Sequence, residues 1–192
     1  REQAYSIMEK QLQQGRQAFL VCPLIEESES IDLKAAVTVF DFIQEHFPSF
    51  KACLIHGKLK KEERQDIMSR FLKKEIQILV STTVIEVGID VPNATVIIIE
   101  HAERFGLAQL HQLRGRVGRG KYASHCLLMA YYPISEEGKS RMKAMQKTSD
   151  GFVIAEEDLK IRGPGDFMGT RQSGMPLLKI ANLLRDIQML ET

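Results

Sequence analysis

Apolar residues gather along the chain in five short runs that are nearly continuous rather than alternating with polar residues. Continuous apolar runs are typical of parallel strands that are buried on both faces of a sheet. Between the runs lie longer segments in which apolar residues recur every three or four positions, as in amphipathic helices. Strands that alternate with helices predict an α/β fold with a mostly parallel sheet and helices on both of its faces. The apolar runs cover residues 19–24, 52–56, 78–82, 95–100 and 125–132.

Three helical segments separate the predicted strands. The first covers residues 3–14, and Gly15 is positioned to end it. The second covers 32–47, for which Asp32 is a candidate N-cap, and the third covers 60–75.

The pattern changes after the fifth apolar run. A basic helical segment at 135–147 precedes a glycine-rich stretch at 161–174 and an amphipathic helical segment at 176–190. We therefore predict a first domain over residues 1–133 and a small appendage of helices and glycine-rich loop over residues 134–192.

Composition narrows the class of protein without naming a partner. A chain of 192 residues with 44% hydrophobic and 27% charged residues can form one full domain and a smaller appendage. The net charge of +1 means that any nucleic-acid site must come from local clusters of charge. No apolar run approaches the roughly 20 residues of a membrane helix, and no secretory signal stands at the start. The three cysteines lie in apolar runs without CxxC spacing, so we expect buried, reduced thiols and a cytosolic protein.

The string HQLRGRVGRG at 111–120 concentrates arginine and glycine directly after an apolar stretch. If the helix that begins before it continues through the string, Gln112, Arg116 and Arg119 share one face and Arg114 points away. Two guanidinium groups on a face thinned by glycine suit close approach to a polyphosphate. A solvated basic face is the alternative that spacing alone leaves open.

A second stretch with polar residues after a buried strand is STTVIEVGIDVPNA at 81–94. Small hydroxyls at the carboxyl end of a parallel strand lie where open α/β sheets bind ligands. Thr82 and Thr83 can hold a phosphate, while Gly88 and Asp90 can supply a tight turn and an acceptor for a ribose hydroxyl or a metal-bound water. The alternative is an ordinary strand followed by a capped helix, with Asp90 as a turn residue.

The chain lacks several motifs that a complete nucleotide hydrolase needs. No GxxxxGK[ST] phosphate loop is present, and the histidines have no metal-ligand spacing. Glu100 follows an apolar strand as a Mg²⁺-binding acid does, but without a phosphate loop we interpret it as a strand-end residue near a domain surface. No complete catalytic site is visible in the chain by itself.

Taken together, STTVIEVGIDVPNA and AERFGLAQLHQLRGRVGRG (102–120) resemble motifs V and VI of superfamily 2 helicases, and in particular the RecG-type branch migration helicases. FLVCPLIEESE (19–29) resembles motif IV, LIHGKL (54–59) resembles the next motif, and the stretch from 152 to 174 resembles the translocation element shared with Mfd. The resemblance implies a second RecA-like motor domain followed by a translocation hairpin. A first motor domain with the phosphate loop, and a wedge domain, would then precede residue 1.

The resemblance also implies roles for individual residues. Arg116 and Arg119 would be arginine fingers that reach ATP across a cleft, and Gln112 would relay between nucleotide and DNA. Gly88 and Asp90 would contact the nucleotide. His56, Gly57, Thr82 and Thr83 would contact the DNA backbone, and the residues that couple hydrolysis to translocation would be Arg162, Arg171 and Gln172.

The implied function is that of an ATP-dependent double-stranded DNA translocase that remodels branched DNA and stalled forks in a bacterial cytoplasm. ATP and Mg²⁺ would be held mainly by the first motor domain, so we expect this chain alone to be inactive. The partners would be forked DNA and the upstream motor and wedge domains, with no membrane. An Mfd-type motor and a non-hydrolysing nucleic-acid-binding module are the alternatives.

Overall fold

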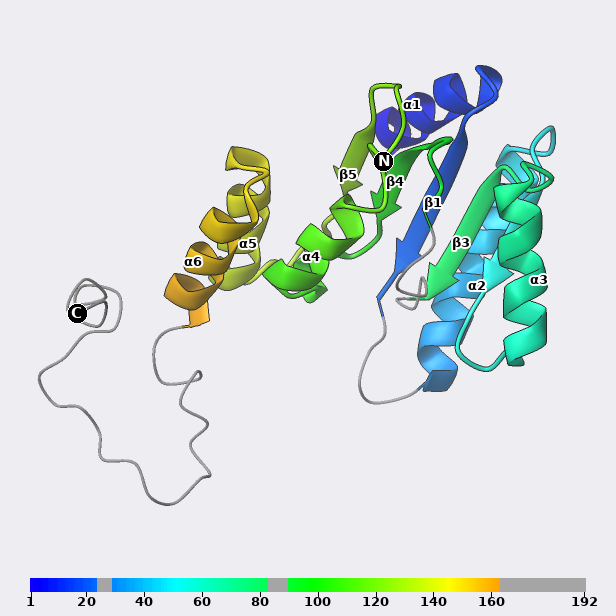
Figure 1. Cartoon of the computed structure of the whole chain (residues 1–192). Helices are drawn as coiled ribbons and strands as arrows, with labels where there is room; N and C mark the ends of the chain where they lie inside the picture. The colour runs from blue at the N-terminus through cyan, green and yellow to red at the C-terminus, as the bar shows by residue number, and fades with distance from the viewer. Residues whose placement is uncertain (24–28, 83–89, 163–192) are drawn as a thin grey trace, which may run out of the picture.

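The computed structural model describes residues 1–23, 29–82 and 90–162, with the side chains of 29–32 and 162 left out. Five strands form one sheet in the order β2-β3-β1-β4-β5, and every neighbouring pair is parallel. The predicted α/β class and parallel sheet are therefore confirmed (Figure 1). The strands are β1 (Gln17–Cys22), β2 (Ala52–Ile55), β3 (Ile78–Thr82), β4 (Ala94–Ile99) and β5 (His125–Leu128).

Six α-helices and one short 3₁₀ helix accompany the sheet in the described part of the chain. Helix α2 begins before Asp32, so the predicted N-cap role of Asp32 is wrong: the residue lies in the first turn. The predicted segment 176–190 lies outside the described residues. The helices are α1 (Glu2–Gln13), α2 (Glu29–His46), α3 (Lys61–Leu72), η1 (Ala102–Arg104), α4 (Leu107–Arg114), α5 (Glu136–Lys147) and α6 (Gly151–Arg162).

Strand residues alternate between two hydrophobic clusters, one on each face of the sheet. Phe19 and Leu79 face the cluster that includes α3 and α4, and Leu20 and Val80 face the cluster that includes α1 and α2. Each of these four side chains is at most 1% exposed. Burial on both faces explains why the strands are continuously apolar.

Helices α5 and α6 lie side by side and pack against α4 (Figure 1). Met145 and Ile154 join the same hydrophobic cluster as Leu110 and Leu113 of α4. The described part of the predicted appendage is therefore docked on the first domain through a shared core, and the boundary near residue 133 stays a prediction.

Candidate functional site

An ion pair joins the two motif-like stretches that the sequence singled out. Arg119 donates from Nη1 to Oδ1 of Asp90, and its Nε donates to the carbonyl oxygen of Gly115 at 2.6 Å. Asp90 lies four positions before β4 begins at Ala94. Two contacts therefore fix the guanidinium of Arg119, on a segment that crosses the entry to β4.

The helix that carries the arginine-rich string ends earlier than predicted. Helix α4 stops at Arg114, and Gly118 adopts a φ of +80°, in the left-handed region that favours glycine. The prediction that Gln112, Arg116 and Arg119 share one helical face is therefore wrong. Gln112 lies on the helix, whereas the two arginines lie on the irregular segment that follows it.

Two of the glycines in this string serve local packing. A Cβ on Gly120 would lie 2.3 Å from the carbonyl oxygen of Pro92, and one on Gly118 would lie 2.9 Å from Oγ of Ser124. Contacts shorter than 3.0 Å force the backbone to move when the neighbour is itself backbone. Gly120 therefore allows residues 115–120, the arginine segment, to lie directly on the turn that leads into β4.

The arginines of the string differ in their surroundings. Arg114 donates from Nη1 to the carbonyls of Met145 at 3.1 Å and Thr148 at 2.6 Å, which ties α4 to the end of α5. Arg116 is half-buried, and within residues 1–23, 29–82 and 90–162 its side chain has no hydrogen bond or ion pair. Gln112 is exposed. Of the residues compared here, Arg116 is therefore the cation available to bind an anion that the described residues do not provide.

Three residues of the set that resembles the DNA contacts lie at the carboxyl edge of the sheet, namely His56, Gly57 and Thr82. Ile55 pairs with Ser81 in the parallel register, so His56 follows β2 at the level of Thr82, where β3 ends. Within the described residues, buried Nδ1 of His56 and Oγ of Ser81 have no hydrogen-bond partner. Among the described residues, a Cβ on Gly57 would meet nothing within 4 Å. Because buried polar groups are normally paired, this edge is a reasonable place for a bound ligand.

Several predicted site residues cannot be located. Gly88, Thr83, Arg171 and Gln172 lie outside the described residues. Arg162 is the last residue of α6, and its side chain is not described.

Glu100 is a buried strand-end residue. It follows β4 directly, as expected, and it is 2% exposed although it borders a cavity. Its carboxylate accepts hydrogen bonds from the hydroxyls of Tyr5 at 3.0 Å and Tyr131 at 2.6 Å, and Arg1 lies 3.6 Å away. Burial, reinforced by the charge of Glu100, raises the pKa of Tyr5 to about 12. The sequence carried no signal for this pairing, because the partners are distant along the chain.

The crevice between β1 and β4 is the point at which the strand order reverses, and open α/β sheets commonly bind ligands at such points. A cavity of about 270 Å³ opens there, bordered by Arg1, Glu100, His101 and Arg104. Arg1 is paired with Glu100, while His101 and Arg104 are paired with Glu103. The cationic side chains that border this cavity thus already have carboxylate partners among the described residues.

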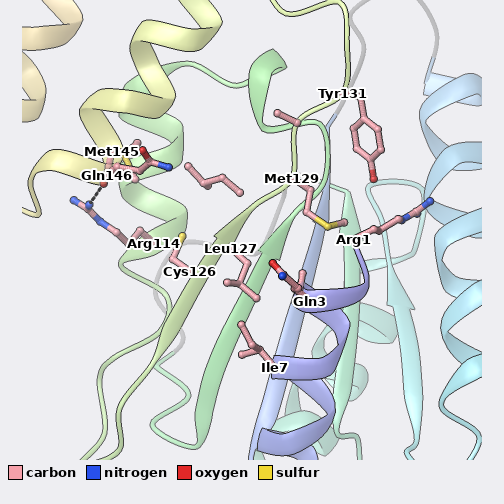
Figure 2. Close-up of a pocket in the computed structure, with 13 residues that line it drawn as sticks. Arg1, Gln3, Ile7, Arg114, Cys126, Leu127, Met129, Tyr131, Met145 and Gln146 are labelled. Atoms are coloured by element: carbon pink, nitrogen blue, oxygen red, sulfur yellow. Dashed lines mark hydrogen bonds between the residues drawn. The ribbon is translucent and has the colours of Figure 1, made fainter.

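A second cavity, of about 570 Å³, runs along β5 between α1 and α5 (Figure 2). Its wall includes Ile7, Leu127, Met129 and Met145, and Arg114 reaches the α5 backbone at one end. None of the predicted site residues that the structure describes lines it. The candidate site is therefore not this cavity but the arginine segment and the carboxyl edge.

Within the described ranges, no three histidine, cysteine, aspartate or glutamate side chains lie close enough to hold a metal ion. The three cysteines are free. No helix among the described residues is sufficiently long and apolar for a bilayer.

Comparison with known proteins assigns the family. The conserved C-terminal domain of helicases matches residues 2–121. The chain belongs to this helicase C-terminal domain family. The C-terminal part of domain 3 of the ATP-dependent DNA helicase RecG matches residues 148–192.

Relatives within the helicases support the more specific resemblance. RecG of Bacillus subtilis is 53% identical over 188 residues, which are 97% of this chain and 27% of that protein. RecG of an Escherichia coli strain is 51% identical over 177 residues, covering 92% of this chain and 26% of that protein. The predicted resemblance to RecG-type helicases is confirmed, and the chain spans about a quarter of the length of these relatives.

Solved structures agree with the sequence relatives. RecG bound to a three-way DNA junction has a TM-score of 0.74 and 45% identity, and the match covers 100% of this chain and 24% of that one. The yeast Dbp5 L327V variant bound to RNA and ADP BeF3 has a TM-score of 0.54 at 15% identity, over 81% of this chain and 40% of that one. The second likeness shows the fold alone, which is the predicted RecA-like helicase fold.

Proposed function

We propose that this chain is the second motor half of a RecG-like, ATP-dependent translocase that moves on double-stranded DNA and remodels branched DNA and stalled replication forks. The observation that carries the proposal is the ion pair between Arg119 and Asp90 together with the nearby Arg116. Arg116 lies three positions before Arg119, and its side chain has no partner in the described chain. Its specific form comes from the 53% identity to a RecG helicase over nearly the whole chain. A guanidinium that is fixed in place, as in Arg119, near a second one without a partner, as in Arg116, suits a site for phosphate groups.

In this proposal Arg116 and Arg119 stabilise the negative charge that develops on the γ-phosphoryl oxygens during hydrolysis. Bound ATP with Mg²⁺ supplies the phosphoryl group that is transferred to water. Mg²⁺ and most phosphate contacts would belong to a first motor domain, as the similarity to RecG helicases implies. Hydrolysis would then require the two halves to close together, which couples the chemistry to motion.

Three further residues complete the nucleotide side. Asp90 holds Arg119 in place and can exchange that contact for a ribose hydroxyl, and Gly88 would contact the nucleotide, as the resemblance implies. Gln112, exposed on α4, relays between nucleotide and DNA. Asp90 is therefore a positioning residue as well as a nucleotide ligand.

The carboxyl edge of the sheet would grip the DNA backbone through His56, Gly57, Thr82 and Thr83. Two observations on the described residues support this role: Nδ1 of His56 has no hydrogen-bond partner there, and the space over Gly57 is open. Backbone contacts suit a translocase, because stepping along any sequence requires phosphates rather than bases.

The last residue of α6, Arg162, and the segment after it, through Arg171 and Gln172, would convert closure into movement. The match of residues 148–192 to RecG domain 3 supports this assignment. In the whole protein, Gln172→Ala should lower fork unwinding more than DNA-stimulated ATP hydrolysis. Equal loss of both activities would contradict the coupling role.

The named relatives are bacterial, and we place the protein in the bacterial cytoplasm, with forked DNA and its own upstream motor and wedge domains as partners. The relatives named above are RecG proteins rather than Mfd proteins, which favours the first of these two motors.

The proposal is tested by measuring phosphate release from ATP by the whole protein and by this chain alone, each with forked and linear DNA. We expect fork-stimulated hydrolysis by the whole protein and none by the isolated chain. DNA binding by the whole protein without hydrolysis would instead identify a binding module and reject the motor.

A further inference from the structure

Tyr122 lies just beyond the arginine segment and is held in an uncommon way for an exposed aromatic residue. The guanidinium carbon of Arg16 lies 3.2 Å from the centre of its ring, and Nζ of Lys121 lies 5.4 Å from it. The residue is nevertheless 38% exposed. The ring is thus supported by a cation while part of it remains open to solvent.

The position of Arg16 is itself fixed by the start of the sheet. Gly15 adopts a φ of +73°, and its carbonyl accepts a hydrogen bond from Nδ2 of Asn93 at 3.0 Å. In the part of the chain that the structure describes, buried Nε of Arg16 has no hydrogen-bond partner. Its guanidinium faces the ring of Tyr122.

Residues 119–122 and residues 90–93 are linked by a series of contacts that leads from Arg119 to the ring of Tyr122. Arg119 contacts Asp90, and Gly120 lies against the carbonyl of Pro92. Tyr122 then contacts Arg16, whose neighbour Gly15 is bonded to Asn93. Three residues span at most about 10 Å, so the backbone of Tyr122 lies within that distance of the backbone of Arg119.

We propose that Tyr122, supported by Arg16, is the stacking platform for the base of the nucleotide whose phosphates face Arg116 and Arg119. The inference rests on the proposed function, because that function supplies the nucleotide. Stacking needs only an exposed ring face, and an aromatic ring offers it at little cost in conformational entropy. The order along the segment would then be phosphates at the arginines, ribose at Asp90 and base at Tyr122. The alternative is that the ring only covers Arg16.

The test uses the whole protein with ATP and with CTP as substrates for DNA-stimulated hydrolysis. Tyr122→Ala should raise the KM for ATP about tenfold and leave kcat within about twofold, since stacking contributes to binding rather than to chemistry. It should also reduce the preference for ATP over CTP, because a purine offers more area for stacking. Tyr122→Phe should behave as the original protein, since the hydroxyl is not needed.

A direct signature is the fluorescence of etheno-adenosine triphosphate, which stacking on an aromatic ring quenches. We expect quenching by the original protein and by Tyr122→Phe, but not by Tyr122→Ala. Tyr132→Ala is the matched control, because Tyr132 is 86% exposed and lies outside the arginine segment. Circular dichroism would verify that each variant is folded.

The outcomes separate this inference from the function on which it rests. Normal KM, normal base preference and retained quenching in Tyr122→Ala overturn the platform while leaving the motor intact. Absence of ATP hydrolysis and of nucleotide binding in the original protein rejects both together.

Discussion

Arg114 and Arg119 come from the same ten-residue string, yet the structure surrounds them differently. The guanidinium of Arg114 donates to the carbonyls at the end of α5 and links two helices. Arg119 is held by a carboxylate and by Gly115 on an exposed segment, and Arg116 beside it has no partner in the described chain. An arginine that satisfies buried carbonyls stabilises the fold, whereas one held at the surface is available to a ligand. The partners of a charged side chain, more than its place in a motif, indicate its role.

The largest expected difference lies in catalysis. In the whole protein, Arg116→Ala and Arg119→Ala should each lower kcat by about 10³ or more, since arginine fingers contribute on this scale to phosphoryl transfer. Neither should change the thermal midpoint appreciably, because neither side chain is anchored in the core. DNA-stimulated phosphate release and a melting curve provide the two measurements.

Lysine at either position is the matched control for charge. It keeps the cation but loses the planar fork, so Arg116→Lys should recover only part of the rate. Near-normal turnover after removal of both guanidinium groups would contradict the finger assignment altogether.

The opposite result is expected at Arg114. Replacing it by alanine leaves the carbonyls of Met145 and Thr148 without their donor and should lower the free energy of unfolding by about 2–3 kcal/mol. Activity per folded molecule should fall far less than in the Arg119 variant. Urea unfolding followed by circular dichroism measures the first effect. A large catalytic loss with unchanged stability would reverse the comparison.

The sequence predicted the strands of the sheet better than it predicted the contacts of the arginines. The five strands and their parallel arrangement were predictable, because a strand buried on both faces reveals itself as a continuous apolar run. The end of α4 at Arg114 was not, since the segment beyond it depends on Pro92, which is distant in the sequence. The partners of Arg114 were hidden for the same reason.

The sequence identified residues of the candidate site but not how they are arranged in space. Resemblance to a helicase family singled out Asp90 and Arg119 separately, and only the structure joined them. Spacing suggested a helical face for Arg116 and Arg119 that does not exist, because a left-handed glycine redirects the backbone. The aromatic platform at Tyr122 had no sequence signal, since its contact with Arg16 spans most of the domain.

A smaller effect tests whether the arginine segment needs its close contact with the turn before β4. In Gly120→Ala the new Cβ would overlap the Pro92 carbonyl oxygen, so the segment must shift, at a cost of about 2 kcal/mol. The shift should also separate Arg119 from Asp90 and lower kcat. Gly57→Ala is the control for stability, because open space surrounds that position. Equal stability of the two variants in urea would show that the contact is dispensable.

The smallest expected effect concerns Glu100, which is anchored in the same manner as Arg114. The pKa of Tyr5 is raised to about 12, and burial and Glu100 also raise the pKa of Tyr131. A phenol in the unfolded chain titrates near its ordinary pKa of about 10, so above that pH the unfolded state loses protons that the native state keeps. The stabilisation is complete below pH 10 and should decline as the pH rises from about 10 toward 12.

Tyr5→Phe should lower the free energy of unfolding at neutral pH by about 1 kcal/mol, by loss of one hydrogen bond, and should flatten the alkaline decline. Tyr132→Phe should change neither, because that side chain is exposed. Urea unfolding at several pH values measures both quantities, and an unaltered alkaline decline in Tyr5→Phe would show that the raised pKa of Tyr5 does not contribute to it.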